Sequence, residues 1–246
     1  MSTDPRWTPG SPLPQAAPLH GFRLPPETSE TPGVPLRLTV AISRETGSRG
    51  ILIAQLVAQR LKWQLYKQET LEYLAHDSHV SRELFEALDD AGKQWVDDQI
   101  ARWADAVPTS MQGSMRDLAR VIFAIGARGE AVILGRGAGF LFPSASTLHG
   151  RVISPRMNRI GFLTQLERLT PEQAAEQVAL RDERRTQLIA TTLQRRPDDL
   201  YQYDLIVNSS MLGEALSAEM LANAAQLMDQ QWQRRREADE AEADGP

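Results

Sequence analysis

The chain has 246 residues and a formal net charge of −5, and 41% of its residues are hydrophobic and 24% charged. This composition is typical of soluble globular proteins and excludes collagen-like, coiled-coil and wholly disordered chains. Because the sequence contains no cysteine, disulfide scaffolds, thiolate metal sites and cysteine nucleophiles are excluded too. No apolar segment reaches the roughly 20 residues of a membrane span, and the N-terminal segment lacks the apolar core of a secretory signal. We therefore expect a cytoplasmic protein with no membrane partner.

The two ends of the chain differ from its middle. Residues 1–35 hold nine of the fifteen prolines, which fix φ and lack a backbone donor, so we predict a disordered, proline-rich leader. Residues 229–246 contain an arginine triplet followed by acidic residues and predict a charged C-terminal tail. The domain expected between them, residues 36–228, has a net charge of −1. Nucleic-acid binding needs a basic face, so we expect no nucleic-acid partner.

The middle of the chain alternates short apolar runs with helical periodicity. Residues 38–42 are apolar and β-rich, and the apolar residues that follow residue 50 recur on one face of a helix. Further strands are expected at residues 131–134, 151–154 and 203–207. Helices are expected at residues 69–75, 81–88, 93–106, 115–128, 155–166, 171 to about 184 or beyond, and 211–232. Short apolar strands separated by helices predict an α/β protein whose parallel sheet has helices on both faces.

The loop at residues 43–50 is the most informative segment, because it leads from a strand into a helix. The backbone N–H groups and the positive dipole end at a helix N-terminus favour an anion. Gly47 and Gly50 permit left-handed φ values and a close approach of backbone to phosphate. The alternative is a plain turn whose helix is capped by Ser48. The full P-loop pattern, G-x-x-x-x-G-K-[ST], is absent.

Arginine is the cation that this chain can offer to a phosphate. There are 24 arginines and only three lysines, none of them in the loop, and the planar guanidinium fork suits phosphate oxygens. Arg44 and Arg49 lie in the loop. Arg181 and Arg185 share a helix face, with Arg184 beside them. This cluster is either a solvated helix face or a lid that clamps an anion.

Five segments together resemble the cytidylate kinase-like family, a branch of the P-loop nucleoside monophosphate kinases. They occur in the family's order and cover about residues 38–222. They are Val40-Ala-Ile-Ser-Arg-Glu-Thr-Gly-Ser-Arg-Gly50, Leu65-Tyr-Lys-Gln-Glu-Thr70, Ala131-Val-Ile-Leu-Gly-Arg-Gly-Ala138, the cluster at residues 181–185, and Tyr203-Asp-Leu-Ile-Val-Asn-Ser209.

The resemblance implies a three-layer P-loop kinase-like fold with a helical acceptor-binding insertion at about residues 68–130 and an arginine-bearing lid. It implies ATP-dependent phosphoryl transfer, with Mg²⁺, to a nucleoside monophosphate or similar small phosphate acceptor, achieved by positioning and charge stabilisation. The residues expected to bind ATP are Arg44, Gly47, Ser48, Arg49 and Gly50. The residues expected to bind the acceptor are Arg136, Gly137 and Arg184. The residues expected to act on the transferred phosphoryl group are Arg181 and Arg185.

The chain departs from the pattern at three positions. Gly50 and Ile51 stand where P-loop kinases carry the lysine and the metal-binding hydroxyl, and Gly137 stands where cytidylate kinases have an acid that helps to hold the acceptor. The metal ligands therefore stay open, with Ser43 and Ser48 as candidate substitute hydroxyls. Losing such groups weakens transition-state stabilisation. A second expectation is thus a catalytically impaired nucleotide-binding or regulatory module, and a third is a loop that binds nothing.

Overall fold

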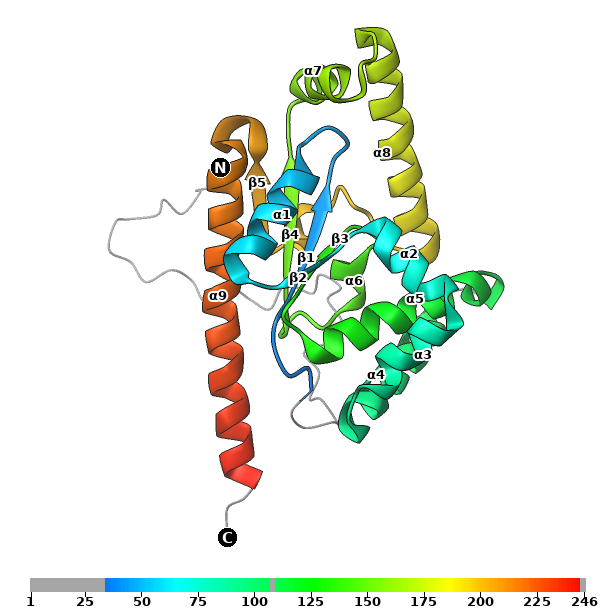
Figure 1. The fold of residues 1–246 in the computed structure, drawn as a ribbon, viewed down its shortest axis with the longest axis vertical. Helices are drawn as coiled ribbons and strands as arrows, with labels where there is room; N and C mark the ends of the chain where they lie inside the picture. The colour runs from blue at the N-terminus through cyan, green and yellow to red at the C-terminus, as the bar shows by residue number, and fades with distance from the viewer. Residues whose placement is uncertain (1–33, 107–108, 244–246) are drawn as a thin grey trace, which may run out of the picture.

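The structure is a computed structural model that describes residues 34–106 and 109–243 (Figure 1). The predicted leader therefore lies outside the described residues, apart from its last two. The strands are β1 (Thr39–Arg44), β2 (Gln64–Tyr66), β3 (Ala131–Leu134), β4 (Thr147–Ile153) and β5 (Leu205–Asn208). The helices are α1 (Gly50–Leu61), α2 (Gln68–His76), α3 (Ser78–Glu86), α4 (Asp90–Ala106), α5 (Thr109–Arg128), α6 (Ala138–Leu141), α7 (Arg156–Glu167), α8 (Pro171–Leu193) and α9 (Ser209–Ala243), with a 3-10 turn at Leu200–Gln202.

The five strands form one sheet in the order β2-β3-β1-β4-β5. Every neighbouring pair is parallel, as the short apolar strands predicted. Strand β2 was not predicted from the sequence. It contains only three residues, none of them buried, at the edge of the sheet, so it lacks the apolar run that marks the other strands.

Helices cover both faces of the sheet, which confirms the three-layer α/β prediction. Val40 and Ile42 of β1 pack with α1 and α9 on one face, whereas Ala41 packs with the α4–α5 side on the other. This alternation follows from the two-residue period of a strand. Figure 1 shows α1 and α9 along one side of the sheet and α2–α6 on the other.

The helices α2–α5 form the block at the position expected for the helical insertion. Trp95 and Trp103 are 2% and 6% exposed, so they belong to the hydrophobic core of this block and offer no surface for a nucleobase. The rings of Trp95 and Phe123 meet edge to face, with centroids 6.1 Å apart. None of the helices in the described ranges is long and apolar enough to cross a membrane.

Helices α7 and α8 project beyond the carboxyl ends of the strands (Figure 1) and occupy the place of the expected lid. They share a small core of their own, made of Ile160, Leu163, Ala174 and Val178. Helix α8 begins with a capping box between Thr170 and Gln173, with Pro171 in the first turn, as its sequence predicted. It continues to Leu193, which agrees with the expectation of a helix to about residue 184 or beyond.

Helix α9 extends through most of the segment that we expected to be a charged tail. It runs to Ala243, and Asp229, which is 7% exposed, accepts hydrogen bonds from the side chain of Arg37 and the backbone of Leu38. Trp232 donates its indole N–H to the Pro35 carbonyl at 3.0 Å. The start of residues 229–246 is thus tied to the segment that leads into β1.

Candidate functional site

The candidate site lies at the carboxyl ends of β1, β3 and β4. The chain places β2 and β3 on one side of β1 and then β4 and β5 on the other, so the strand order reverses at β1. In open parallel sheets, ligands bind in the crevice outside such a reversal. Two pockets of about 510 and 580 Å³ lie here, and the loop from β1 to α1 contributes to both. We call them the arginine pocket and the serine pocket.

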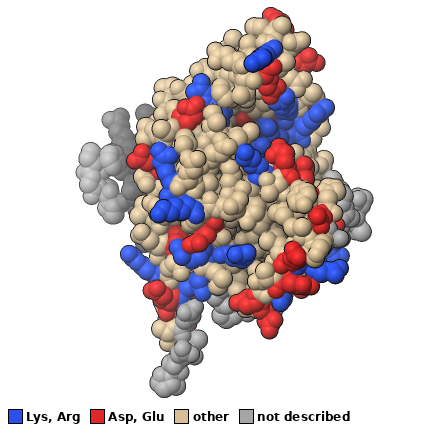
Figure 2. All heavy atoms as spheres, viewed as in Figure 1, with Lys and Arg blue, Asp and Glu red and all other residues tan. Residues whose placement is uncertain are grey.

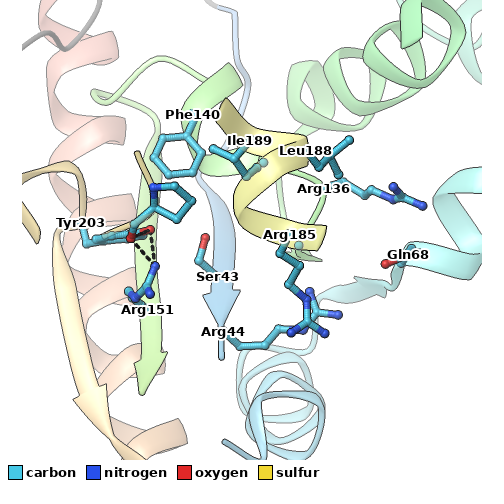
Figure 3. A pocket seen from close by; sticks show the side chains of 13 residues that line it. Ser43, Arg44, Gln68, Arg136, Phe140, Arg151, Arg185, Leu188, Ile189 and Tyr203 are labelled. Carbon is cyan, nitrogen blue, oxygen red and sulfur yellow. Dashed lines mark hydrogen bonds between the residues drawn. The ribbon is translucent and has the colours of Figure 1, made fainter. Parts of the chain in front are cut away.

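The arginine pocket combines a cationic side with an apolar side (Figure 3). Arg44, Arg136 and Arg185 come from the end of β1, the turn after β3 and helix α8. Leu188, Ile189, Phe140 and Pro197 form the apolar side. The remaining lining residues are Ser43, Gln68, Gly135, Gly137, Arg151 and Tyr203. Figure 2 shows acidic and basic side chains interspersed over the visible face of the molecule, so the gathering of arginine is local to the pocket.

Arg44 is held in the arginine pocket by contact with two glycines. A Cβ on Gly50 would lie 2.7 Å from Arg44 Cβ, and a Cβ on Gly135 would lie 2.1 Å from Arg44 Nη1. The guanidinium has no hydrogen bond or ion pair with any residue that the structure describes. Burial lowers the pKa of Arg44 to about 10, and the positive charge of Arg185 lowers it as well. The Glu69 carboxylate favours the charged form of Arg44 from a distance, but burial and the charge of Arg185 outweigh it. The pocket therefore contains a cation that has no direct counterion among the described residues.

Arg136 is placed by three successive left-handed residues. The φ values of Gly135, Arg136 and Gly137 are 84°, 56° and 71°, and a left-handed arginine is a strained conformation of the kind found at ligand sites. Its Nη2 forms an ion pair with Glu72, while its buried Nε has no partner among the described residues. Burial lowers the pKa values of both Arg136 and Arg185.

The structure brings together some of the expected site residues and separates others. Arg44, Arg136, Gly137 and Arg185 line one pocket. Arg181 instead forms a two-bond ion pair with Glu167 of α7, at 2.6 and 2.8 Å. The other expected acceptor ligand, Arg184, is exposed and lines neither pocket. Of the three clustered arginines of α8, Arg185 is thus the one that lines the pocket in this conformation.

The serine pocket lies on the other side of the loop. It is lined by Gly47, Arg49, Ser154, Asn158, Gly161, Phe162, Gln165, Ser209 and Ser210. The Arg49 guanidinium pairs with Glu214 at 3.1 Å and lies 5.0 Å from the centre of the Phe162 ring, so it points away from the arginine pocket. The N-termini of α1 and α9 both reach this pocket. The backbone N–H groups of Gly47, Arg49 and Gly50 have no hydrogen-bond partner in the described part of the chain.

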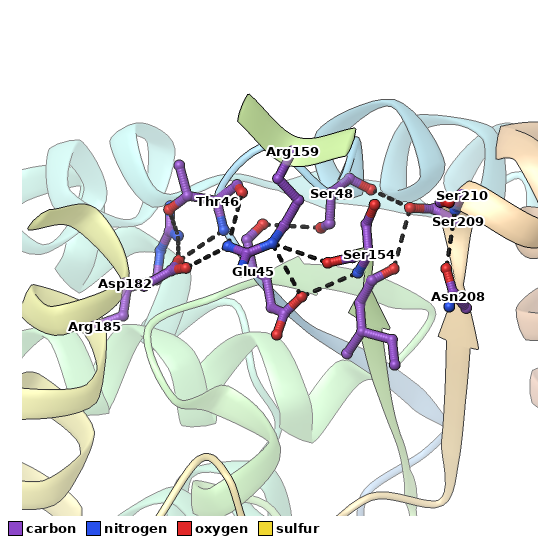
Figure 4. A network of polar contacts seen from close by, with 11 residues as sticks. Glu45, Thr46, Ser48, Ser154, Arg159, Asp182, Arg185, Asn208, Ser209 and Ser210 are labelled. Atoms are coloured by element: carbon purple, nitrogen blue, oxygen red, sulfur yellow. Dashed lines mark hydrogen bonds and ion pairs between the residues drawn. The ribbon is translucent and has the colours of Figure 1, made fainter. Parts of the chain in front are cut away.

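A polar network clamps the lid onto the loop (Figure 4). The Thr46 backbone donates to Asp182 Oδ1 at 2.8 Å, and Arg159 of α7 donates to Asp182 Oδ2 at 2.5 Å. Arg159 also reaches the Ser154 carbonyl and the Glu45 carboxylate, and Arg185 donates to the Thr46 hydroxyl. The Asp182 carboxylate therefore occupies a loop amide that would otherwise be available to an external anion.

Gly47 and Ser48 of the loop have structural roles that the sequence did not reveal. A Cβ on Gly47 would lie 2.5 Å from the carbonyl oxygen of Arg159, so this glycine admits backbone of the lid. The Ser48 hydroxyl donates to the Glu45 carbonyl at 2.9 Å. The alternative prediction that Ser48 caps α1 is wrong, because Arg49, with φ 61°, occupies the N-cap position without a side-chain bond.

No dedicated metal cage is visible in the described ranges, which contain no group of three or more His, Asp or Glu side chains suited to an ion. Mg²⁺ in phosphoryl-transfer sites usually takes most of its ligands from phosphates and water, with one or two carboxylates. The two candidate carboxylates are Glu45, which lies in the loop, and Asp182, which contacts it. Both form ion pairs with Arg159.

The comparisons with known proteins agree with the fold. The cytidylate kinase-like family matches residues 39–211, from β1 to the start of α9, whereas no curated protein matches the chain. An uncharacterized protein from Eubacterium ventriosum is similar in structure, with a TM-score of 0.52 at 16% identity over 79% of this chain and 99% of that one. A Thermus thermophilus protein has a TM-score of 0.45 at 15% identity, over 78% and 98%. The shikimate kinase of Bacteroides thetaiotaomicron has a TM-score of 0.40 at 13% identity, over 78% and 97%.

Proposed function

The chain belongs to the cytidylate kinase-like family, and we propose that it is a cytoplasmic, ATP-dependent phosphotransferase that acts on a nucleoside monophosphate or similar small phosphate acceptor. The observation that carries this proposal is the convergence of Arg44, Arg136 and Arg185 on one pocket. They come from three elements, and Arg44 forms no direct ion pair within the described structure. A buried cation without a counterion is costly unless a ligand supplies the negative charge.

The acceptor side of the site is the arginine pocket. Arg136 would bind the anionic group of the acceptor, as expected. Arg44, expected at ATP, and Arg185, expected at the transferred phosphoryl group, would instead join it there, because all three line the same pocket. Leu188, Ile189 and Phe140 would cover the less polar part of the acceptor. Because Leu188 and Ile189 belong to the lid helix, the same residues that contact the acceptor also keep water from it. Positioning and fixed positive charge are the main sources of rate enhancement in phosphoryl transfer.

The donor side is the loop with the serine pocket, and its residues fit a polyphosphate. The N–H groups of Gly47, Arg49 and Gly50, at the positive end of α1, would hold phosphate oxygens, and the Arg49 side chain adds a positive charge beside them. When bound, ATP supplies the phosphoryl group and Mg²⁺ neutralises phosphate charge. The Asp182 carboxylate limits the space at Thr46, so full use of this loop requires α8 to release it.

A second candidate function is a regulatory module that binds nucleotide without turnover. The specific observation in its favour is that the Thr46 amide is already paired with Asp182, in a loop with no lysine. Ile51, at the position of the metal-binding hydroxyl, exposes 48% of its surface to solvent and offers no ligand. On this reading the clamped lid is the resting state of a sensor.

The test is an assay of ADP release in the presence of Mg²⁺, ATP and a panel of nucleoside monophosphates and other small phosphates, run beside calorimetry. The proposal predicts turnover that depends on the acceptor and an increase of tenfold or more in acceptor KM for Arg44→Ala. The matched control is Arg60→Ala, which removes an exposed arginine at the far end of α1. Binding of ATP without any acceptor-dependent turnover would support the regulatory module instead.

A further inference from the structure

A buried histidine that the sequence did not single out lies directly behind the arginine pocket. The Ser43 hydroxyl, which lines the pocket, lies 3.0 Å from His149 Nε2, and His149 Nδ1 lies 2.9 Å from the Gln202 carbonyl oxygen. A carbonyl can only accept, so Nδ1 carries the proton. In the neutral imidazole, Nε2 is then an acceptor, and the Ser43 hydroxyl donates to it. Figure 3 shows Ser43 at the end of β1, between Arg151 and Arg185.

The imidazole is held rigidly in this orientation. His149 is 4% exposed, and its ring meets Phe140 at 4.8 Å and Tyr203 at 4.5 Å between centroids. A Cβ on Gly139 would lie 2.1 Å from His149 Cδ2, so that position must be glycine for the ring to fit. The structure thus fixes the tautomer and the direction of Nε2 toward Ser43.

Ser43 is the member of this pair that lines the pocket. The cations among the lining residues are Arg44, Arg136, Arg151 and Arg185. The Asp204 carboxylate accepts the backbone N–H of His149 at 2.8 Å. The Tyr203 hydroxyl accepts from Arg151 at 2.6 Å and donates to the Pro197 carbonyl. Burial raises the pKa of Tyr203, so this phenol does not compete as a base.

We infer that Ser43 and His149 form a proton relay, and that the atom phosphorylated in the arginine pocket is a hydroxyl oxygen of a small anionic acceptor. This inference rests on the proposed phosphotransferase function. A phosphate monoester has its second pKa at about 6, so at pH 7 its oxygens can attack without a base. A hydroxyl must lose its proton, and a Ser–His pair aimed into the pocket has a use only in that case.

The transfer balances as follows. The acceptor hydroxyl oxygen forms a bond to the γ-phosphorus of ATP, and the bond from that phosphorus to the leaving ADP oxygen breaks. The acceptor proton passes to Ser43 Oγ while the Ser43 proton passes to His149 Nε2. Arg44, Arg136 and Arg185 bind a separate phosphate or carboxylate group of the acceptor. Ser43 touches the substrate and is catalytic, whereas His149 acts through it as a positioning residue that also stores the proton.

The first experiment identifies the product. The full-length protein with Mg²⁺ and ATP is incubated separately with nucleoside monophosphates, sugar phosphates and hydroxy carboxylates, and the products are read by phosphorus NMR. The expected result is a new phosphate monoester on a hydroxyl. A phosphoanhydride formed from a nucleoside monophosphate would overturn the relay but leave the phosphotransferase standing. Absence of turnover with every acceptor would overturn both.

The second experiment tests the relay itself. His149→Asn keeps an N–H for the Gln202 carbonyl and removes the base, so kcat should fall about 100-fold or more with acceptor KM changed less than threefold. The acidic limb of the kcat–pH profile should disappear. Ser43→Ala should lower kcat and change the pH profile to the same extent as His149→Asn. It therefore tests the relay even if the histidine variant does not fold. Ser43→Thr should restore part of the rate. The control is the exposed His79→Asn. An unchanged kcat in His149→Asn and Ser43→Ala, or a loss with the pH profile intact, would contradict the relay.

Discussion

At the residue scale, Arg44 shows how this site is kept ready for an anion at the expense of stability. Its guanidinium is largely buried beside Arg185, and its pKa falls to about 10, first because of burial. In the folded protein the charged form is therefore less favourable than in the unfolded chain. Residues that reduce stability in this way are concentrated at binding sites, where the ligand provides the compensating interaction.

We predict that Arg44→Met stabilises the protein by about 0.5–2 kcal/mol at pH 7 while weakening acceptor binding. The depressed pKa means that the cost is present below about pH 10 and declines above it, because the unfolded state then binds more protons than the folded state. Urea denaturation of both proteins at pH 7 measures the difference. A variant less stable than the wild type would show that Arg44 is held by interactions that favour its charge.

Asp182 is the residue that keeps the lid on the loop. We predict that Asp182→Asn binds Mg²⁺–ATP about fivefold more tightly in calorimetry, because an amide competes less well than a carboxylate for the Thr46 N–H and releases Arg159 and Arg185. The control is Glu183→Gln, which changes a neighbouring exposed carboxylate that accepts a hydrogen bond from Gln187. Weaker binding in Asp182→Asn would mean that the nucleotide needs this carboxylate.

The site residues that could be predicted are those whose own sequence neighbourhood carries a signal. Arg44 ends a buried strand just before a Gly/Ser turn, Arg136 follows a buried strand between two glycines, and Arg185 lies in an arginine cluster. Arg159, Asp182 and His149 could not be predicted in the same way. The contacts of Arg159 and Asp182 with Thr46 join residues 113 and 136 positions apart, and Ser43 and His149 are 106 apart. Only the folded sheet brings these pairs together.

At the element scale, the start of α8 was easier to predict than its end. The start of α8 could be predicted from Thr170, Pro171 and Gln173, which form its capping box and first turn. The end of α8 lacks the glycine that commonly marks a helix C-terminus. Gln194 adopts the left-handed conformation there, with φ 52°. The sequence therefore predicted a helix to about residue 184 or beyond without fixing its end, and the helix runs nine residues further, to Leu193. These last residues include Leu188 and Ile189, which belong to the apolar side of the arginine pocket.

We predict that Thr170→Ala destabilises the lid by about 1 kcal/mol, because the Gln173 N–H loses its side-chain acceptor and the capping box opens. Hydrogen exchange at the first turn of α8 should quicken about fivefold, since a local opening free energy of that size changes the rate by this factor. Thr191→Ala, at an exposed position in the last turn of the same helix, is the control and should leave this exchange unchanged. Equal exchange in Thr170→Ala and the wild type would show that α7 alone holds the helix start.

At the scale of the whole molecule, the two ends of the described chain are fastened to each other. Arg37 and Leu38, just before β1, bind Asp229 near the end of α9, and Arg236 donates to the Leu36 carbonyl at 2.6 Å. Helix α9 also packs along α1. The central strand and the loop that follows it are thereby anchored by the last helix. The position of the site depends on a segment that its charge pattern alone would assign to a solvated tail.

This anchoring predicts a pH-dependent contribution to stability from Asp229. Burial by itself raises the Asp229 pKa, but hydrogen bonds from Arg37 and Leu38 outweigh it and hold the pKa below the ordinary value of 3.8. A carboxyl with a depressed folded-state pKa stabilises the protein fully above the unfolded pKa, and the contribution is lost as the pH falls through the folded value. Asp229→Asn should therefore cost about 1–2 kcal/mol at pH 7 and progressively less below pH 4.

Urea denaturation of the wild type and Asp229→Asn at pH 7, 5 and 3 measures this dependence. Asp198→Asn is the control, because that carboxylate pairs with Arg196 on the exposed surface and exposed pairs contribute little. A difference between Asp229→Asn and the wild type that is the same at all three pH values would assign the loss to packing of α9 rather than to the charge. The difference in unfolding free energy between Asp198→Asn and the wild type could also decline with acid as much as that of Asp229→Asn. The effect would then come from net charge, because no specific contact between β1 and α9 would be needed to explain it.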